Sequence, residues 1–184
     1  DLLNPYGLLG GIATLGLFLL HGAIFVALKS DGDVRVDARS LAVRMWLPVT
    51  AIGAVFAVWT QLEHGKAWTW AMVVLAAAGL LAAGPLVRAG RELAAFLATS
   101  LTVIGVSVLL FGALFPNVLN ATDPARSITI EAAASSHYTL VVMSWCLVVL
   151  LPLVMIYQAW TYWVFRKRIS AAQIPPSIGL SPRA

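Results

Sequence analysis

The sequence predicts an all-α membrane protein with five transmembrane helices, and three observations support that fold class. Hydrophobic residues make up 60% of the 184 residues and charged residues only 11%, whereas soluble domains carry about 25% charged residues. The sequence contains five apolar runs that are each long enough to cross a bilayer, which takes about 20 residues. The charged side chains lie almost entirely outside these runs. A soluble globular domain is therefore excluded.

The five predicted spans cover residues 6–28, 41–62, 68–87, 93–115 and 138–165. The second is the weakest, because Arg44, Pro48 and Gln61 fall within it. Arg44 lies near its start, where a long basic side chain can reach the headgroups. Residues 1–168 are thus predicted to form one transmembrane domain. The proline-containing segment 169–184 is predicted to be a flexible cytoplasmic tail.

Basic residues predict how the chain is oriented. If the spans alternate, only Lys66 and Arg126 fall on one side of the membrane. An excess of Lys and Arg marks the cytoplasmic side, so the N-terminus of this chain is expected outside and the C-terminus inside. Because these charges flank apolar runs, they indicate membrane lipid and not nucleic acid as the partner. The basic residues on the cytoplasmic side are Lys29, Arg35, Arg39, Arg44, Arg88, Arg91, Arg166, Lys167, Arg168 and Arg183.

His21 is the only histidine deep in a predicted span. Polar groups in hydrocarbon are costly and often functional, so His21 is a candidate haem ligand or proton relay. The alternative is a histidine hydrogen-bonded to a neighbouring helix. No second span offers a histidine at a similar depth to complete a bis-histidine site. Met143 and Met155 could serve as axial partners, but apolar packing is the commoner role of methionine.

Carboxylates are missing from the interior of every predicted span. Asp31, Asp33 and Asp37 are assigned to the cytoplasmic loop, and Glu63 to the outer edge of the second span. Coupled transporters usually need a carboxylate near the midplane, which argues against a secondary transporter. Glu63 with His64 and Lys66 could contact a proton or a quinone head, or could form a solvated loop.

Gly7 and Gly11 form a G-x-x-x-G pattern at the start of the first span. Small residues at this spacing allow close approach of another helix, from within the chain or from a partner. The single cysteine, Cys146, excludes an intrachain disulfide. No motif indicates a catalytic residue or a metal site.

Two stretches of the sequence carry a recognisable pattern. The first is Leu3-Asn-Pro-Tyr-Gly-Leu-Leu-Gly-Gly11, followed by His21-Gly-Ala23 and Leu28-Lys29. The second comprises Phe115-Pro116, Ser127-Ile-Thr-Ile130, Ala134-Ser-Ser136, Tyr138-Thr-Leu140, Leu151-Pro152 and Tyr157-Gln-Ala-Trp-Thr-Tyr-Trp-Val-Phe-Arg-Lys-Arg-Ile169. In order and spacing these stretches resemble subunit II of cytochrome bd quinol oxidase, and the resemblance extends over nearly the whole chain.

The resemblance implies a specific arrangement of the five helices. Family members are about twice this length, with two four-helix bundles and a peripheral helix. The five spans here are expected to supply one four-helix bundle plus the peripheral helix, as the C-terminal half of the usual chain. The usual N-terminal half, with its membrane-embedded acids, is not in this sequence.

The resemblance also implies a function. The expected complex is a respiratory oxidase of the bacterial cell (plasma) membrane, which oxidises quinol and reduces dioxygen to water. Haems b and d are expected in subunit I, so this chain is expected to bind no haem directly and not to be catalytic itself. A structural quinone is a further candidate ligand. Candidate cofactor-contacting residues are His21, Trp145 and Tyr157.

Expected partners are subunit I, the N-terminal half of its own chain, membrane lipid and small accessory subunits. Two alternative functions stay open. A secondary transporter or channel would require an intramembrane carboxylate or broken helices. A haem- or quinone-binding redox enzyme in its own right would require His21 as a ligand.

Overall fold

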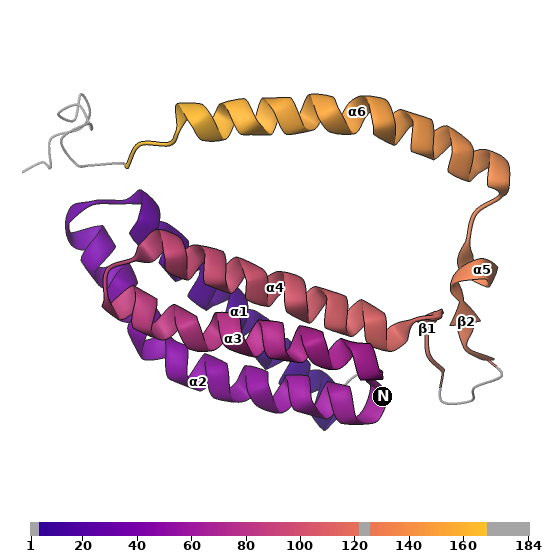
Figure 1. Cartoon of the computed structure of the whole chain (residues 1–184), viewed down its shortest axis with the longest axis horizontal. Coiled ribbons are helices and arrows are strands. Elements are labelled where there is room, and N and C mark those ends of the chain that lie inside the picture. The colour runs from indigo at the N-terminus through magenta and orange to yellow at the C-terminus, as the bar shows by residue number, and fades with distance from the viewer. Residues whose placement is uncertain (1–3, 122–125, 169–184) are drawn as a thin grey trace, which may run out of the picture. The chain divides into compact units, whose positions relative to one another are not determined.

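The computed structural model describes residues 4–121 and 126–168. The chain divides into two compact units, each of which is described by itself. One unit contains the described residues up to Leu109 together with Arg168, and the other contains 110–167. The elements, in order, are α1 (Pro5–Lys29), α2 (Gly32–His64), η1 (Ala67–Thr69), α3 (Trp70–Arg88), α4 (Glu92–Leu114), β1 (Asn117–Leu119), β2 (Ile128–Thr129), α5 (Ile130–Ala133) and α6 (His137–Val164) (Figure 1).

Five helices in the described part of the chain are long and apolar enough to cross a membrane. They are α1, α2, η1 continued by α3, α4 and α6, and the predicted all-α membrane fold is confirmed. Four of them begin and end within two residues of the predicted spans. The predicted tail 169–184 lies outside the described residues.

The second helix is longer than predicted. Residues 32–40 were expected to lie in a loop, but α2 already begins at Gly32 and includes Asp33 and Asp37. Asp31 starts the helix, because its Oδ1 accepts a hydrogen bond from the Gly32 N–H at 3.0 Å and satisfies one of the free donors of the first turn. The loop assignment was wrong because hydropathy detects only the part of a helix that lies in lipid.

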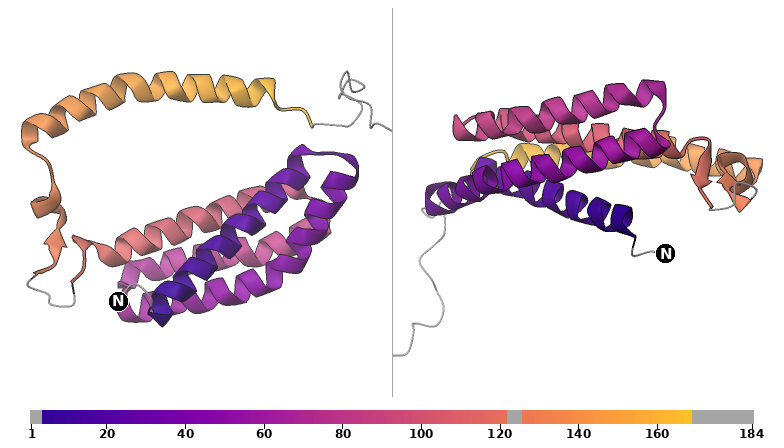
Figure 2. Two further views of the ribbon diagram at one scale, coloured as in Figure 1. Left: turned by 180° about the vertical axis from the view of Figure 1, so that it is seen from behind. Right: turned by 90° about the horizontal axis from the view of Figure 1, so that it is seen from below.

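The first unit is a bundle of α1, α2, α3 and the greater part of α4, lying side by side (Figures 1 and 2). α1 packs on α2, where Phe56 lies against Gly10. α2 packs on α3 through Trp46, which lies so close to Gly84 that a Cβ there would overlap the ring. α3 packs on α4, where Thr102 Oγ1 donates a hydrogen bond of 3.1 Å to the Ala76 carbonyl.

Contacts between α1 and α4 close this ring of four helices. Each helix therefore touches the preceding and the following one, as in an up-down-up-down bundle with short loops. The apolar core of the unit consists of Leu17, Leu20, Ala23, Ile24, Ala42, Val49, Leu80, Val87 and Ala95.

The second unit contains a small hairpin and the long helix α6. β1 and β2 pair antiparallel, with Asn117 opposite Thr129. α5 is a single turn that follows β2 at once. None of the 28 residues of α6 is buried, so the other elements of the second unit do not cover this apolar helix.

Candidate functional site

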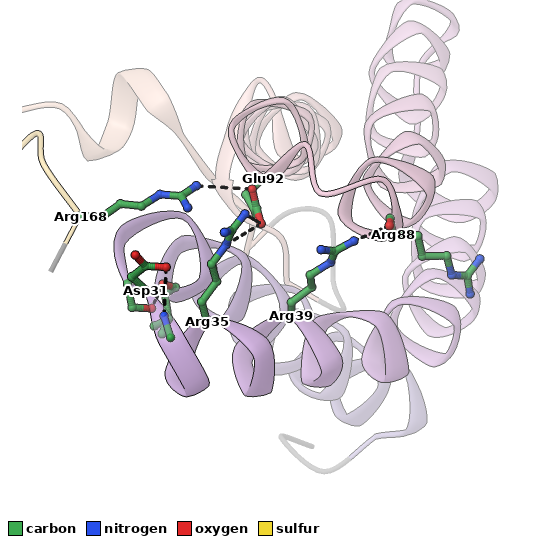
Figure 3. A network of polar contacts seen from close by, with 9 residues as sticks. Asp31, Arg35, Arg39, Arg88, Glu92 and Arg168 are labelled. Atoms are coloured by element: carbon green, nitrogen blue, oxygen red, sulfur yellow. Dashed lines mark hydrogen bonds and ion pairs between the residues drawn. The ribbon is translucent and has the colours of Figure 1, made fainter. Parts of the chain in front are cut away.

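A network of charged residues lies at one end of the helical bundle (Figure 3). Arg35 and Arg39 come from the first turns of α2, Arg88 ends α3, and Glu92 begins α4. These residues meet because α2 starts at the end of the bundle where α3 stops and α4 starts. Sequence positions far apart thereby form one group of charges.

Glu92 is the centre of this group and is only 3% exposed. Its Oε1 accepts hydrogen bonds from Arg35 Nη2 at 2.8 Å and from Arg35 Nε at 3.1 Å. Its Oε2 lies 3.6 Å from Arg168 Nη2. A buried carboxylate is costly unless it is paired and hydrogen-bonded, and Glu92 is both. The positive end of the α4 dipole adds a further favourable interaction.

Glu92 was not among the residues singled out from the sequence. It precedes the predicted fourth span by one residue and therefore counted as part of a short loop. An acid directly before an apolar run is a typical helix-start signal, and this would have placed it in the first turn. Its burial depends on arginines that lie far away in the sequence, which no local pattern indicates.

The adjacent end of α3 is fixed by its own hydrogen bonds. Gly90 has a positive φ of 72°, which favours glycine, and the Arg91 N–H donates to the Leu86 carbonyl at 2.9 Å. This turn leaves the Arg88 carbonyl available, and Arg39 Nη2 donates to it. A cation at a helix C-terminus is favourable.

Trp46 links the same end of α3 to α2. Its Nε1–H donates to the Leu80 carbonyl at 2.7 Å. The Arg88 guanidinium lies over its ring, with the carbon 4.9 Å from the ring centroid, a distance that allows a cation–π interaction. Trp46 is therefore held by one polar and one charged contact as well as by packing.

His21 lies between α1 and α4. Its Nδ1 is 2.8 Å from Thr99 Oγ1, and its ring stacks on Phe96 with the centroids 4.6 Å apart. This contact corresponds to the alternative interpretation of His21 from the sequence, a histidine that is hydrogen-bonded to a neighbouring helix. A role as a haem ligand or proton relay stays a prediction. Trp145 and Tyr157, the other candidate cofactor contacts, are exposed on α6 in the second unit.

The predicted packing glycines are not packed within the described chain. Gly7 and Gly11 are exposed, and a Cβ at Gly11 would meet nothing within 4 Å. The close approach of α1 to α2 uses Gly10 and Gly16 instead. Contact of the Gly7/Gly11 face with a partner stays a prediction.

The opposite end of the bundle is held by hydrogen bonds of Gln61. Gln61 is buried and accepts a hydrogen bond of 2.8 Å from Thr69 Oγ1. Its Nε2 donates to the Lys66 carbonyl at 2.9 Å. Glu63 and His64 are exposed, and Glu63 accepts from Trp59 Nε1 at 3.0 Å. Gln61 thus fixes the turn between α2 and α3, and a proton or quinone contact at Glu63 stays a prediction.

Comparison with known proteins identifies the family of this chain. Residues 1–165 match the family described as cytochrome bd terminal oxidase subunit II. The chain belongs to this family. The match includes all five membrane helices, so the bundle and α6 are both parts of the subunit II sequence.

Two relatives illustrate the similarity. The chain is 32% identical over 177 residues to the cytochrome bd ubiquinol oxidase subunit 2 of Bacillus subtilis (strain 168), covering 92% of this chain and 52% of the relative. It is 28% identical over 209 aligned positions to the cytochrome bd-I ubiquinol oxidase subunit 2 of Escherichia coli (strain K12), covering 95% and 55%. The chain therefore spans about half the length of these subunit II relatives.

Proposed function

We propose that this chain is the C-terminal half of a subunit II that supports a haem-bearing subunit I in a bd-type quinol oxidase. The family match over residues 1–165 carries the proposal, together with relatives that are named as subunits of ubiquinol oxidases. The complete complex would oxidise quinol and reduce dioxygen to water in the bacterial cell membrane. In this proposal haems b and d belong to subunit I.

The surface of α6 supports a role in docking. Trp145 and Tyr157 are 68% and 59% exposed. They lie about 12 Å and 10 Å inside the ends of α6, at 1.5 Å per residue, and thus away from the interfacial zones that aromatic residues prefer in a membrane. Aromatic residues are enriched at protein–protein interfaces. We therefore propose that subunit I or the N-terminal half of the chain packs against the side of α6 that includes Trp145 and Tyr157, which lie about a third of a turn apart.

The hydroxyl group of Tyr157 also favours docking at α6. Within the described residues of the second unit, this hydroxyl group has no hydrogen-bond partner. A hydroxyl in hydrocarbon costs free energy unless it is hydrogen-bonded. An acceptor on a docked subunit would satisfy it. Docking through α6 would thus use both the apolar surface of the helix and the Tyr157 hydroxyl.

The two ionisable groups engaged inside the bundle fit a supporting role. His21 bonds to Thr99, and Glu92 is paired with Arg35 and Arg168. These contacts hold neighbouring helices together. A structural quinone remains part of the proposal, because an isoprenoid tail needs only apolar cover, which the exposed faces of α1 and α6 offer.

We place the arginine-rich end of the bundle in the cytoplasm. Arg35, Arg39 and Arg88 gather there (Figure 3), as the excess of basic residues on the inner side of membrane proteins requires. The start of α1 then faces outwards. Small accessory subunits are further proposed partners.

Affinity purification in mild detergent tests the proposed partnership. We expect a larger membrane polypeptide to co-purify with the tagged full-length chain. Trp145→Ala should lower its yield, whereas Leu151→Ala, at an exposed apolar position on the side of α6 away from Trp145 and Tyr157, is the matched control. A chain that purifies alone, even after chemical cross-linking in intact membranes, would overturn the proposal.

A further inference from the structure

An open groove of about 460 Å³ lies between the first turns of α2 and the end of α3. Pockets that hold small molecules span about 300–1,000 Å³, so the groove can hold a headgroup-sized ligand. Its lining residues are Val36, Arg39, Ser40, Val43, Arg44 and Arg88.

The groove is strongly basic. Three of its six lining residues are arginines, and none is an acid. Arg44 is exposed and makes no hydrogen bond or ion pair with any described residue. The buried acid Glu92 lies at the same end of the bundle, but its carboxylate is already paired with Arg35 and Arg168. No lining residue therefore supplies a carboxylate to neutralise these arginines.

Two of the three arginines are held in place by the fold. Arg39 donates to the Arg88 carbonyl at the end of α3. The guanidinium of Arg88 lies over the Trp46 ring. Ordering these side chains in advance lowers the entropy cost of binding a ligand. Arginine also presents several N–H donors that match the oxygens of a phosphate group.

Apolar side chains adjoin the charges. Val36 is 64% exposed and Leu41 50% exposed, and the apolar run of α2 begins at Leu41. The groove thus lies where the helix passes from the aqueous phase into lipid. A free anion would use only the arginines, whereas a phospholipid would use both the arginines and the apolar surface.

We propose that this groove binds the headgroup of an anionic phospholipid. Arg44 and Arg88 contact the phosphate, Arg39 positions the end of α3, and the acyl chains follow the apolar surface of α2. Basic pockets at the cytoplasmic ends of membrane helices are suited to such headgroups. The inference does not depend on the oxidase function, because it rests on the groove and on the proposed cytoplasmic location of this end of the bundle.

The test uses the full-length protein with its natural partners, reconstituted into nanodiscs of phosphatidylcholine with a small fraction of labelled phosphatidylglycerol. We expect retention of phosphatidylglycerol over labelled phosphatidylcholine when the protein is re-extracted in detergent. Arg44→Gln should lower this retention about fivefold, the effect of one basic residue at a membrane surface, and Arg88→Gln similarly. Arg91→Gln, an exposed arginine at the same end that does not line the groove, is the matched control and should leave retention unchanged.

Three outcomes would overturn the proposal. The first is unchanged retention in Arg44→Gln, which decides the question alone if Arg88→Gln does not fold. The second is an equal loss in Arg91→Gln, since this would indicate a diffuse charge effect. The third is full displacement of the lipid by inorganic phosphate, which would identify a site for a free anion.

Discussion

Arg35 and Glu92 are 57 positions apart in the sequence, yet the guanidinium of Arg35 donates two hydrogen bonds to a single carboxylate oxygen of Glu92. Glu92 is buried, whereas the Arg35 side chain is 31% exposed. The pair joins the start of α2 to the start of α4. It thus connects two helices that are not consecutive in the chain.

Replacing Glu92 by alanine should destabilise the bundle. The substitution removes the acceptor of Arg35 and leaves a half-buried guanidinium unpaired. Breaking a fully buried pair costs about 3–5 kcal/mol; the partial exposure of Arg35 reduces this to about 1–3 kcal/mol. The measurement is the free energy of unfolding by SDS titration in mixed micelles. Glu131→Ala, at an exposed acid of α5, should stay within about 0.5 kcal/mol of the parent protein, and equal losses in both variants would contradict the assignment.

Gly84→Ala should also destabilise the protein, because the added methyl group would overlap the ring of Trp46. That ring cannot move freely, since it is hydrogen-bonded to the Leu80 carbonyl. Overpacking of this kind costs about 1–3 kcal/mol. Gly22→Ala is the matched control in another helix, with nothing within 4 Å of the added atom, and should be neutral or slightly stabilising. A stable Gly84→Ala protein would show that α2 and α3 do not approach this closely.

Gly11→Leu tests whether the outer face of α1 meets a partner. The added side chain has free space within the described chain, so the stability of the bundle itself should be unchanged. If this face is an interface, the yield of the assembled complex and its haem content should fall several-fold. Ala51→Leu, at an exposed position of α2, controls for adding a large apolar group to the surface. Equal yields from Gly11→Leu and the parent protein would exclude this face as the interface.

His21 and Thr99 provide a fourth test. Thr99→Val keeps the shape of the side chain but removes the hydroxyl next to His21 Nδ1, and should cost about 1 kcal/mol of unfolding free energy. Ser107→Ala, which removes an exposed hydroxyl of the same helix, should have almost no effect.

His21→Leu should leave every haem band of the purified complex in place, because we propose that His21 has a structural role through its hydrogen bond to Thr99. Loss of one haem band, with both subunits still present, would instead identify His21 as a ligand.

Much of the fold could be predicted from the sequence. The limits of α1, α3, α4 and α6 follow from apolar runs, because lipid imposes one helix length on each crossing. The start of α2 could not be predicted in this way. Its first two turns carry Asp33 and Asp37 and lie beyond the apolar run, so hydropathy does not indicate where the helix begins.

The polar sites were less predictable. His21 could be singled out because it is the one histidine within an apolar run, but its partner Thr99 depends on how α1 meets α4. Gly7 and Gly11 matched a packing motif, whereas the packed glycines are Gly10 and Gly16. The sequence motif does not specify which face of α1 turns inward.

The most direct test of the proposed function is the reduced-minus-oxidised absorption spectrum of the complex purified through a tag on this chain. We expect haem b and haem d bands in the intact complex. We also expect these bands to leave with the larger subunit when that subunit is stripped away. Haem bands that stay with the isolated chain, or a colourless complex that is otherwise intact, would contradict the proposed supporting role.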